Sequence, residues 1–67
     1  MRVTPLKLKR VEAGVLQIEL AIRAGVDGSR LSQLENGWAR ASDDELRRIG
    51  RVLHVPAEAL QNKEPIG

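Results

Sequence analysis

Apolar residues along the chain recur at intervals of three and four, in short blocks that glycine and proline residues separate. Two helix starts carry clear capping signals. Thr4 stands before Pro5, and Ser42 is followed three residues later by Glu45, as in a capping box. The pattern predicts an all-α protein, with helices over about residues 5–13, 17–24, 28–36, 43–54 and, in a short fifth helix, 56–61.

The amino-acid composition fits one small domain. The chain has 67 residues, no cysteine and a single aromatic residue, Trp38, so its core must consist of Leu, Ile, Val and Ala side chains. Such side chains suit closely packed helices better than a sheet. We expect one domain over residues 1–61 and a flexible tail over 62–67, without room for a fused ligand-binding domain.

The sequence offers no signal for a membrane or for export. No apolar run approaches the ~20 residues that cross a bilayer. The basic residues near the start are not followed by the apolar stretch of a secretory signal. We therefore expect a cytoplasmic protein without a membrane partner.

The charges are unevenly distributed along the chain. The net charge is only +2, but seven of the nine carboxylates follow residue 25, so the N-terminal third is the electropositive end.

His54 has neither a second histidine nor a cysteine to share a metal ion, and no nucleophile–base set can be assembled around it. We expect no metal, no cofactor and no enzymatic activity.

The segment from residue 17 to residue 34 carries the functional signal. Its two short helices are joined by only four residues, which forces them to cross steeply. Ala21 is small enough for such a crossing, and Gly25 suits the turn. This spacing is typical of a helix-turn-helix that presents its second helix to the major groove of DNA, although a plain helical hairpin remains the alternative.

Several residues resemble the phage-repressor (XRE-type) family of DNA-binding domains, to which the Cro repressors belong. The shared residues span about 6–60, and they are Arg10, Gly14, Gln17, Glu19, Leu20, Ala21, Gly25 and the run Gln33, Leu34, Glu35, Asn36 and Gly37. The resemblance implies a compact five-helix domain, encoded by a bacterium or a phage and associated with the nucleoid. It also implies sequence-specific DNA binding with the third helix in the major groove.

The resemblance assigns roles to individual residues. Base contacts fall on the third helix, at Gly28, Ser29, Arg30, Ser32 and Gln33. Phosphate contacts fall on Lys9, Arg10, Gln17, Asn36, Gly37, Trp38 and Arg40. Arg10 has a second, structural role in the family, as the ion-pair partner of Glu35, and we favour that role.

Three of these assignments stay open. Gly28 replaces the long polar side chain usual in the family, so either base readout moves to Arg30, Gln33 and DNA shape, or the backbone approaches DNA closely. Arg30 could contact a guanine or a phosphate, or it could be a solvent-exposed helix residue without a DNA contact. Trp38 suits either the sugar–phosphate edge or packing over the loop that follows the third helix.

The expected function is that of a transcriptional regulator, in particular a repressor, that binds an inverted-repeat operator as a homodimer. The dimer is expected to be weak without DNA, with an interface formed by Val52, Val55, Pro56, Ala59 and Leu60.

A second possibility is a protein-interaction regulator of the same fold, antitoxin-like or polymerase-contacting. It would act through an apolar surface formed by Leu8, Ile18 and Ile22. Leu16 also departs from the family, which usually has a Ser, Thr or Asn cap at this position.

Overall fold

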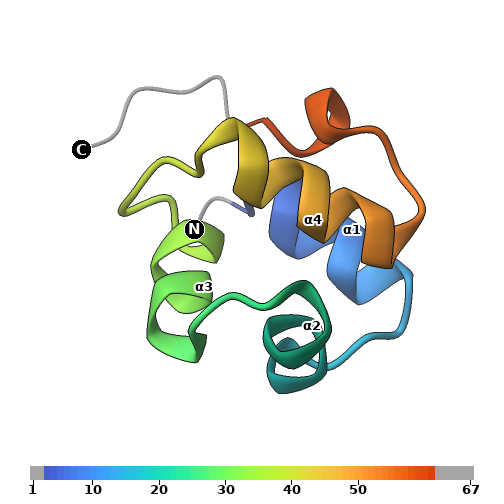
Figure 1. Ribbon diagram of the computed structural model, residues 1–67, viewed down its shortest axis with the longest axis horizontal. Coiled ribbons are helices and arrows are strands. Elements are labelled where there is room, and N and C mark those ends of the chain that lie inside the picture. Colours follow the sequence, from blue (N-terminus) through green and yellow to red (C-terminus); the bar gives the residue numbers. More distant parts are fainter. Residues whose placement is uncertain (1–2, 62–67) are drawn as a thin grey trace.

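The computed structural model describes residues 3–61, and this part of the chain is all-helical (Figure 1). Its elements are α1 (Pro5–Glu12), α2 (Gln17–Ala24), α3 (Gly28–Glu35), α4 (Asp43–Leu53) and the 3-10 helix η1 (Ala57–Leu60). Helix α4 packs against α2 and η1, while α1 packs against α3 and η1. The tail expected over residues 62–67 lies outside the described residues.

The expected count of five α-helices is not met, because the last element is a single 3-10 turn. Ala59 N donates to the carbonyl oxygen of Pro56, three residues earlier, at 3.0 Å. The backbone then becomes extended at Gln61. The chain therefore has four α-helices and one 3-10 helix within residues 3–61.

The helix ends follow the capping residues. The Thr4 hydroxyl accepts from Lys7 N at 3.2 Å, and the expected capping box of Ser42 and Glu45 is present in both directions. Helix α2 has the predicted bounds, whereas α1, α3 and α4 each end one residue earlier than predicted.

Helix α4 ends in a left-handed turn that the sequence pattern did not predict. His54 adopts the left-handed conformation with a φ of 59°, a position where glycine is usual. Four residues earlier, Gly50 lets the chain pass closely over the helix. A Cβ atom at Gly50 would lie 2.6 Å from the carbonyl oxygen of Val55. This close passage brings η1 down onto α4.

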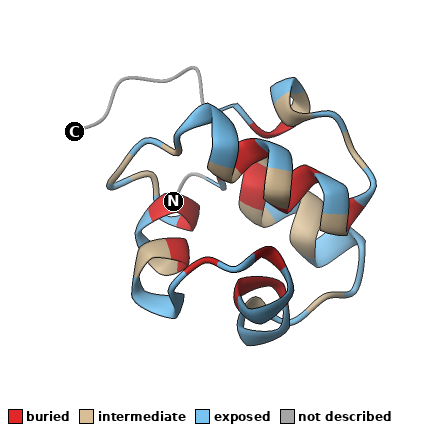
Figure 2. Cartoon of the chain, in the orientation of Figure 1, coloured by how far each residue is buried: buried red, intermediate tan, exposed pale blue. Residues whose placement is uncertain are grey.

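Buried residues line the inner sides of the helices (Figure 2). Most of them are leucines, with Ile49, Val26, Ala21 and Ala24, and every element contributes at least one. Leu20, Leu31 and Ile49 are completely buried, and they join α2, α3 and α4. Leu60 closes the core from η1. Because only 2% of Leu60 is exposed, its side chain belongs to the core, although it was expected at the surface of a dimer interface.

Candidate nucleic-acid interface

Helices α2 and α3 form a helix-turn-helix. Gly25 ends α2 in the left-handed conformation, with a φ of 69°. Val26 N then donates to the carbonyl oxygen of Ala21 at 2.9 Å, and the Val26 side chain is buried. Ala21 is buried as well, as a steep crossing of two helices requires. The Asp27 carboxylate accepts from Ser29 N at 3.1 Å and so starts α3.

Four of the five predicted base-contacting residues share one side of α3. Gly28, Ser29 and Gln33 are exposed, and Ser32 is half-buried. Their spacing of three and four residues places them next to one another on the helix surface. They form a polar, uncharged strip, here named the reading face.

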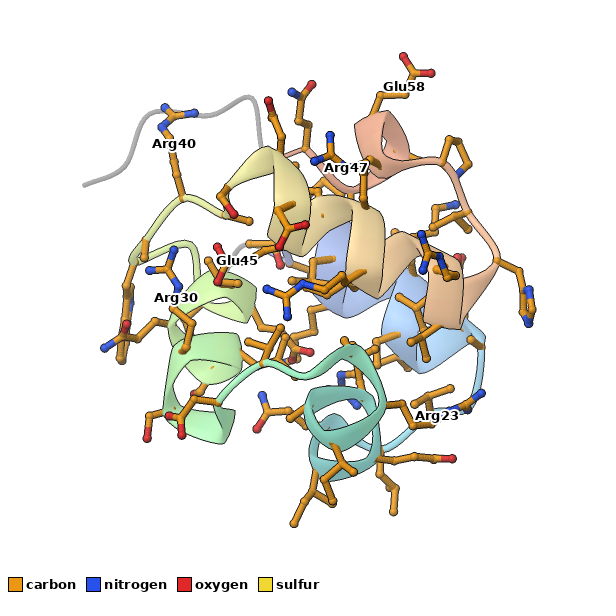
Figure 3. The ribbon with its side chains drawn as sticks, in the orientation of Figure 1. Arg23, Arg30, Arg40, Glu45, Arg47 and Glu58 are labelled. Atoms are coloured by element: carbon orange, nitrogen blue, oxygen red, sulfur yellow. The ribbon has the colours of Figure 1, made fainter. Side chains whose placement is uncertain are left out.

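The fifth predicted residue, Arg30, points elsewhere. Its guanidinium forms a two-pronged ion pair with Glu45 of α4, in which Nε donates to Oε2 and Nη2 donates to Oε1, each at 3.0 Å (Figure 3). Nη2 also donates to the carbonyl oxygen of Arg40 at 3.0 Å. The structure therefore joins the Arg30 guanidinium to α4 and to the loop before it, although Arg30 lies three residues before Gln33 on the same helix.

Gly28 has no role in packing. Its backbone is not in the left-handed region, and a Cβ atom built on it would meet nothing within 4 Å. The fold therefore tolerates a side chain at this position, in contrast to Gly50.

The predicted phosphate contacts after α3 lie on the loop that leads to α4. Asn36 caps α3, and its side-chain Nδ2 donates to the carbonyl oxygen of Ser32 at 2.9 Å. Gly37 has a φ of 75°. Trp38 is 71% exposed, which argues against the expected packing of its ring over this loop. Arg40 is exposed on the last part of the loop (Figure 3).

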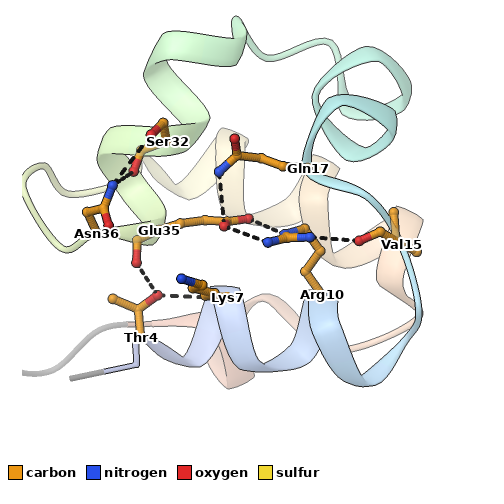
Figure 4. Close-up of polar contacts among 8 residues, drawn as sticks. All are labelled: Thr4, Lys7, Arg10, Val15, Gln17, Ser32, Glu35 and Asn36. Atoms are coloured by element: carbon orange, nitrogen blue, oxygen red, sulfur yellow. Dashed lines mark hydrogen bonds and ion pairs between the residues drawn. The ribbon is translucent and has the colours of Figure 1, made fainter. Parts of the chain in front are cut away.

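Arg10 lies inside the protein, on Glu35 (Figure 4). Its Nε donates to Oε2 of Glu35 at 2.6 Å, and its Nη2 donates to Oε1 at 3.1 Å. Nη1 donates to the carbonyl oxygen of Val15 at 2.8 Å. The expected ion pair is thus present, and it leaves little of the Arg10 guanidinium for a phosphate. Lys9, on the same helix, forms an exposed ion pair with Glu12 at 3.6 Å.

The start of α2 combines a constrained side chain with an uncapped backbone. Gln17 Nε2 donates to Oε1 of Glu35 at 3.1 Å, which fixes the carboxamide between α2 and α3 (Figure 4). The residue before it, Leu16, is exposed and provides no side-chain cap, unlike the residues before α1, α3 and α4. The first backbone N–H groups of α2 therefore lack a side-chain acceptor.

Two residues that matter for this surface were not identified from the sequence. From the sequence, Glu45 was expected only as a helix cap, and its ion pair with Arg30 was missed. The hydrogen bonds from Arg30 and from the Ser42 backbone N–H together lower the pKa of the Glu45 carboxyl group to about 2. Arg48 supports the turn of the helix-turn-helix. Its Nη1 donates to the carbonyl oxygens of Ala24 at 3.2 Å and Gly25 at 3.0 Å. The one sequence signal for Arg48 is its position four residues after Asp44, its ion-pair partner at 3.0 Å.

Other kinds of site find no support among the described residues. In residues 3–61, no group of three His, Cys, Asp or Glu side chains has the arrangement of a metal site. No helix in that range has the length and apolar character needed to cross a membrane.

Comparisons with known proteins agree with this geometry. A family model described as a helix-turn-helix domain matches residues 4–62. Two uncharacterized HTH-type transcriptional regulators, from two strains of Mycobacterium tuberculosis, are each 40% identical to the chain over 55 residues. That alignment covers 82% of this chain but only 39% of either relative. No solved structure matches the chain with significance. The family predicted from the sequence is confirmed: the chain belongs to the helix-turn-helix domain family.

Proposed function

We propose that the protein is a transcription regulator that binds a specific DNA sequence by inserting α3 into the major groove. The observation that carries this proposal is the reading face. It is polar and open to solvent, and it lies on the second helix of a helix-turn-helix. The relatives named as HTH-type transcriptional regulators support the same class of function.

Gln33 is the main base-reading residue in this proposal. Its exposed carboxamide has a donor and an acceptor in the arrangement that pairs with adenine, a contact that provides about 1–3 kcal/mol of discrimination. Ser29 and Ser32 bond to several bases and therefore specify weakly. At Gly28 the open space above the backbone lets DNA approach α3 closely, so we favour this alternative for the glycine.

Phosphate contacts flank the reading face on two sides. On one side, the first N–H groups of α2 have no side-chain cap and would donate to a phosphate oxygen. Gln17 Nε2 already donates to Glu35, so its second amide hydrogen would serve the same phosphate. On the other side, Asn36, the backbone at Gly37, Trp38 and Arg40 lie along the loop to α4. Such contacts set the register of the protein on the duplex without reading its sequence.

The protein is proposed to act as a repressor, by occupying a promoter as a twofold dimer on an inverted repeat. Val52, Val55 and Ala59 are half-buried and Pro56 is exposed, so the end of α4 and η1 retain apolar surface for a partner subunit. Leu60 does not contribute to that surface, because it is buried. With so few apolar residues available, the dimer is expected to form mainly on DNA.

A second function is favoured by the outer side of α2. Ile18 and Ile22 are 69% and 74% exposed, and their spacing of four residues places them side by side. Leu8 on α1 is also exposed. A protein partner that covers Ile18 and Ile22 would make this domain a protein-interaction regulator. Replacing both residues by Glu would then abolish regulation in cells while leaving the intrinsic DNA affinity nearly unchanged.

DNA binding is tested by titrating a labelled mixed-sequence duplex with the protein at several salt concentrations. We expect Arg40→Ala to weaken binding to all sequences and to reduce the salt slope by about one unit. The matched control is Arg47→Ala. Arg47 is an exposed arginine on α4, so its removal changes the net charge as Arg40→Ala does. It lies two residues after Glu45, so its side chain points in a different direction from that of Glu45. Equal effects of the two variants would contradict the placement of Arg40 on DNA.

A further inference from the structure

Arg30 connects three parts of the protein at one point. It comes from the first turn of α3, its ion-pair partner Glu45 is in the first turn of α4, and its third hydrogen bond goes to the backbone of Arg40 in the loop between them. The Glu45 carboxylate also accepts from Ser42 N at 2.8 Å. The same carboxylate therefore fixes α3, the start of α4 and, through Arg30, the loop (Figure 3).

Backbone-to-backbone hydrogen bonds hold the loop on either side of Arg40. From the α3 side, Gly37 N donates to the carbonyl oxygen of Leu34 at 3.2 Å, and Trp38 N donates to that of Gln33 at 2.9 Å. Within residues 3–61, backbone-to-backbone hydrogen bonds then resume at Ser42, whose carbonyl oxygen accepts from Leu46 N. Arg40 lies between these two anchors, and Arg30 holds its carbonyl oxygen.

The geometry and burial of Glu45 favour a stable ion pair with Arg30. The Glu45 side chain is only 13% exposed, and both of its oxygens accept from the planar guanidinium. If Arg30 turned toward a base, it would leave a mostly buried carboxylate without its cation, which is unfavourable. Its hydrogen bond to the loop would also be lost.

We propose that Arg30 is a positioning residue that, through Glu45, holds the α3–α4 loop so that Arg40 meets a DNA phosphate at a fixed distance from the reading face. Arg30 itself reads no base. This inference rests on the proposed DNA-binding function.

The decisive variant is Glu45→Gln, because the two roles of Arg30 predict opposite results. Glutamine at this position still suits the capping box, so α4 keeps its start. If Arg30 bound DNA directly, removing its intramolecular partner would free it, and the loss of a negative charge would strengthen binding further. If Arg30 positions the loop, the same change weakens binding although the protein becomes more positive.

We expect Glu45→Gln to weaken binding of a labelled mixed-sequence duplex several-fold and to reduce the salt slope by about one unit, as Arg40→Ala does. Combining the two substitutions should produce no further loss of slope, because both remove the same phosphate contact. The matched control is Asp43→Asn, which removes one carboxylate from the same helical turn. It should leave the slope unchanged and the affinity equal to or above that of the wild type.

A second variant guards against loss of folding. Arg30→Lys keeps the positive charge but cannot bond both Glu45 oxygens and the loop carbonyl together. We expect Arg30→Lys to reduce the slope as Glu45→Gln does, while thermal unfolding shows both variants folded at the assay temperature.

The proposal is overturned if Glu45→Gln binds as tightly as the wild type or more tightly with an unchanged slope, or if Arg30→Lys retains the wild-type slope. Failure of the proposed function gives a different result. In that case the wild type and Arg40→Ala would both show no salt-dependent binding, whatever the residue at position 45.

Discussion

The Nε atom of Arg10 lies 2.6 Å from Oε2 of Glu35, a glutamate that is only 2% exposed. Gln17 donates to the other carboxylate oxygen, and the Thr4 hydroxyl donates to the backbone oxygen of Glu35 at 2.8 Å. A buried carboxylate with this many donors is compensated. Glu35 therefore ties α1 and the start of α2 to the end of α3, which sets the position of the reading face.

Removal of one partner should unfold the domain readily. We expect Arg10→Met to lower the free energy of unfolding by about 3–5 kcal/mol, because it leaves the Glu35 charge buried without its cation. Urea denaturation measures the change. Arg23→Ala is the control, since its ion pair with Glu19 is exposed and about half of each side chain faces solvent. Equal losses in the two variants would contradict the role of the buried pair.

Two glycines should respond oppositely to alanine. Gly50→Ala forces a Cβ atom to within 2.6 Å of the Val55 carbonyl oxygen, so we expect a loss of about 1–3 kcal/mol in stability. Gly28→Ala has open space and a helical backbone, so it should stabilise the fold by roughly 0.5–1 kcal/mol. Thermal unfolding distinguishes the two. A stable Gly50→Ala variant would show that the close passage of the chain is not obligatory.

Helix α2 should gain stability from a cap. We expect Leu16→Ser to raise the free energy of unfolding by about 0.5–1 kcal/mol, because the hydroxyl accepts from a free N–H group of the first turn. The same hydroxyl competes with a DNA phosphate for these donors, so DNA affinity should fall while stability rises. Leu16→Ala, which adds no acceptor, is the control for the lost side chain. A rise in both stability and affinity would argue against phosphate binding at α2.

Stability should decline in acid because of Glu45. Its carboxyl pKa is lowered from 4.5 to about 2 in the folded protein, mainly by the hydrogen bonds from Arg30. A lowered pKa contributes stability above the unfolded value, and this contribution is lost as the pH falls from about 5 to about 2. Denaturation at a series of pH values should show a steeper acid loss for the wild type than for Glu45→Gln. Parallel pH profiles would contradict this account of the ion pair.

Much of the fold could be predicted from local signals. Capping residues and glycines placed the ends of α1 to α4 within one residue, because these signals act over one helical turn. The contact of Arg10 with Glu35 spans 25 residues and was expected only through resemblance to a known family. The same holds for most of the reading face.

What could not be predicted depends on tertiary packing. The hydrogen bonds of Arg30 to Glu45 and of Arg48 to Ala24 join helices far apart in the sequence, and no local spacing indicates them. The burial of Leu60 depends on how closely η1 passes over Gly50. These contacts argue against the roles expected for Arg30 and Leu60, and the element that carries Leu60 is a 3-10 helix where an α-helix was predicted.

We propose that α3 reads a DNA sequence through Gln33. The test is a selection of bound duplexes from a random pool, with the wild type and Gln33→Ala compared at the same salt concentration. We predict that the wild type enriches an inverted repeat, and that Gln33→Ala relaxes the preference at one symmetric pair of positions by about 1–3 kcal/mol. The absence of any enriched sequence with the wild type, with salt-sensitive general binding alone, would contradict the claim.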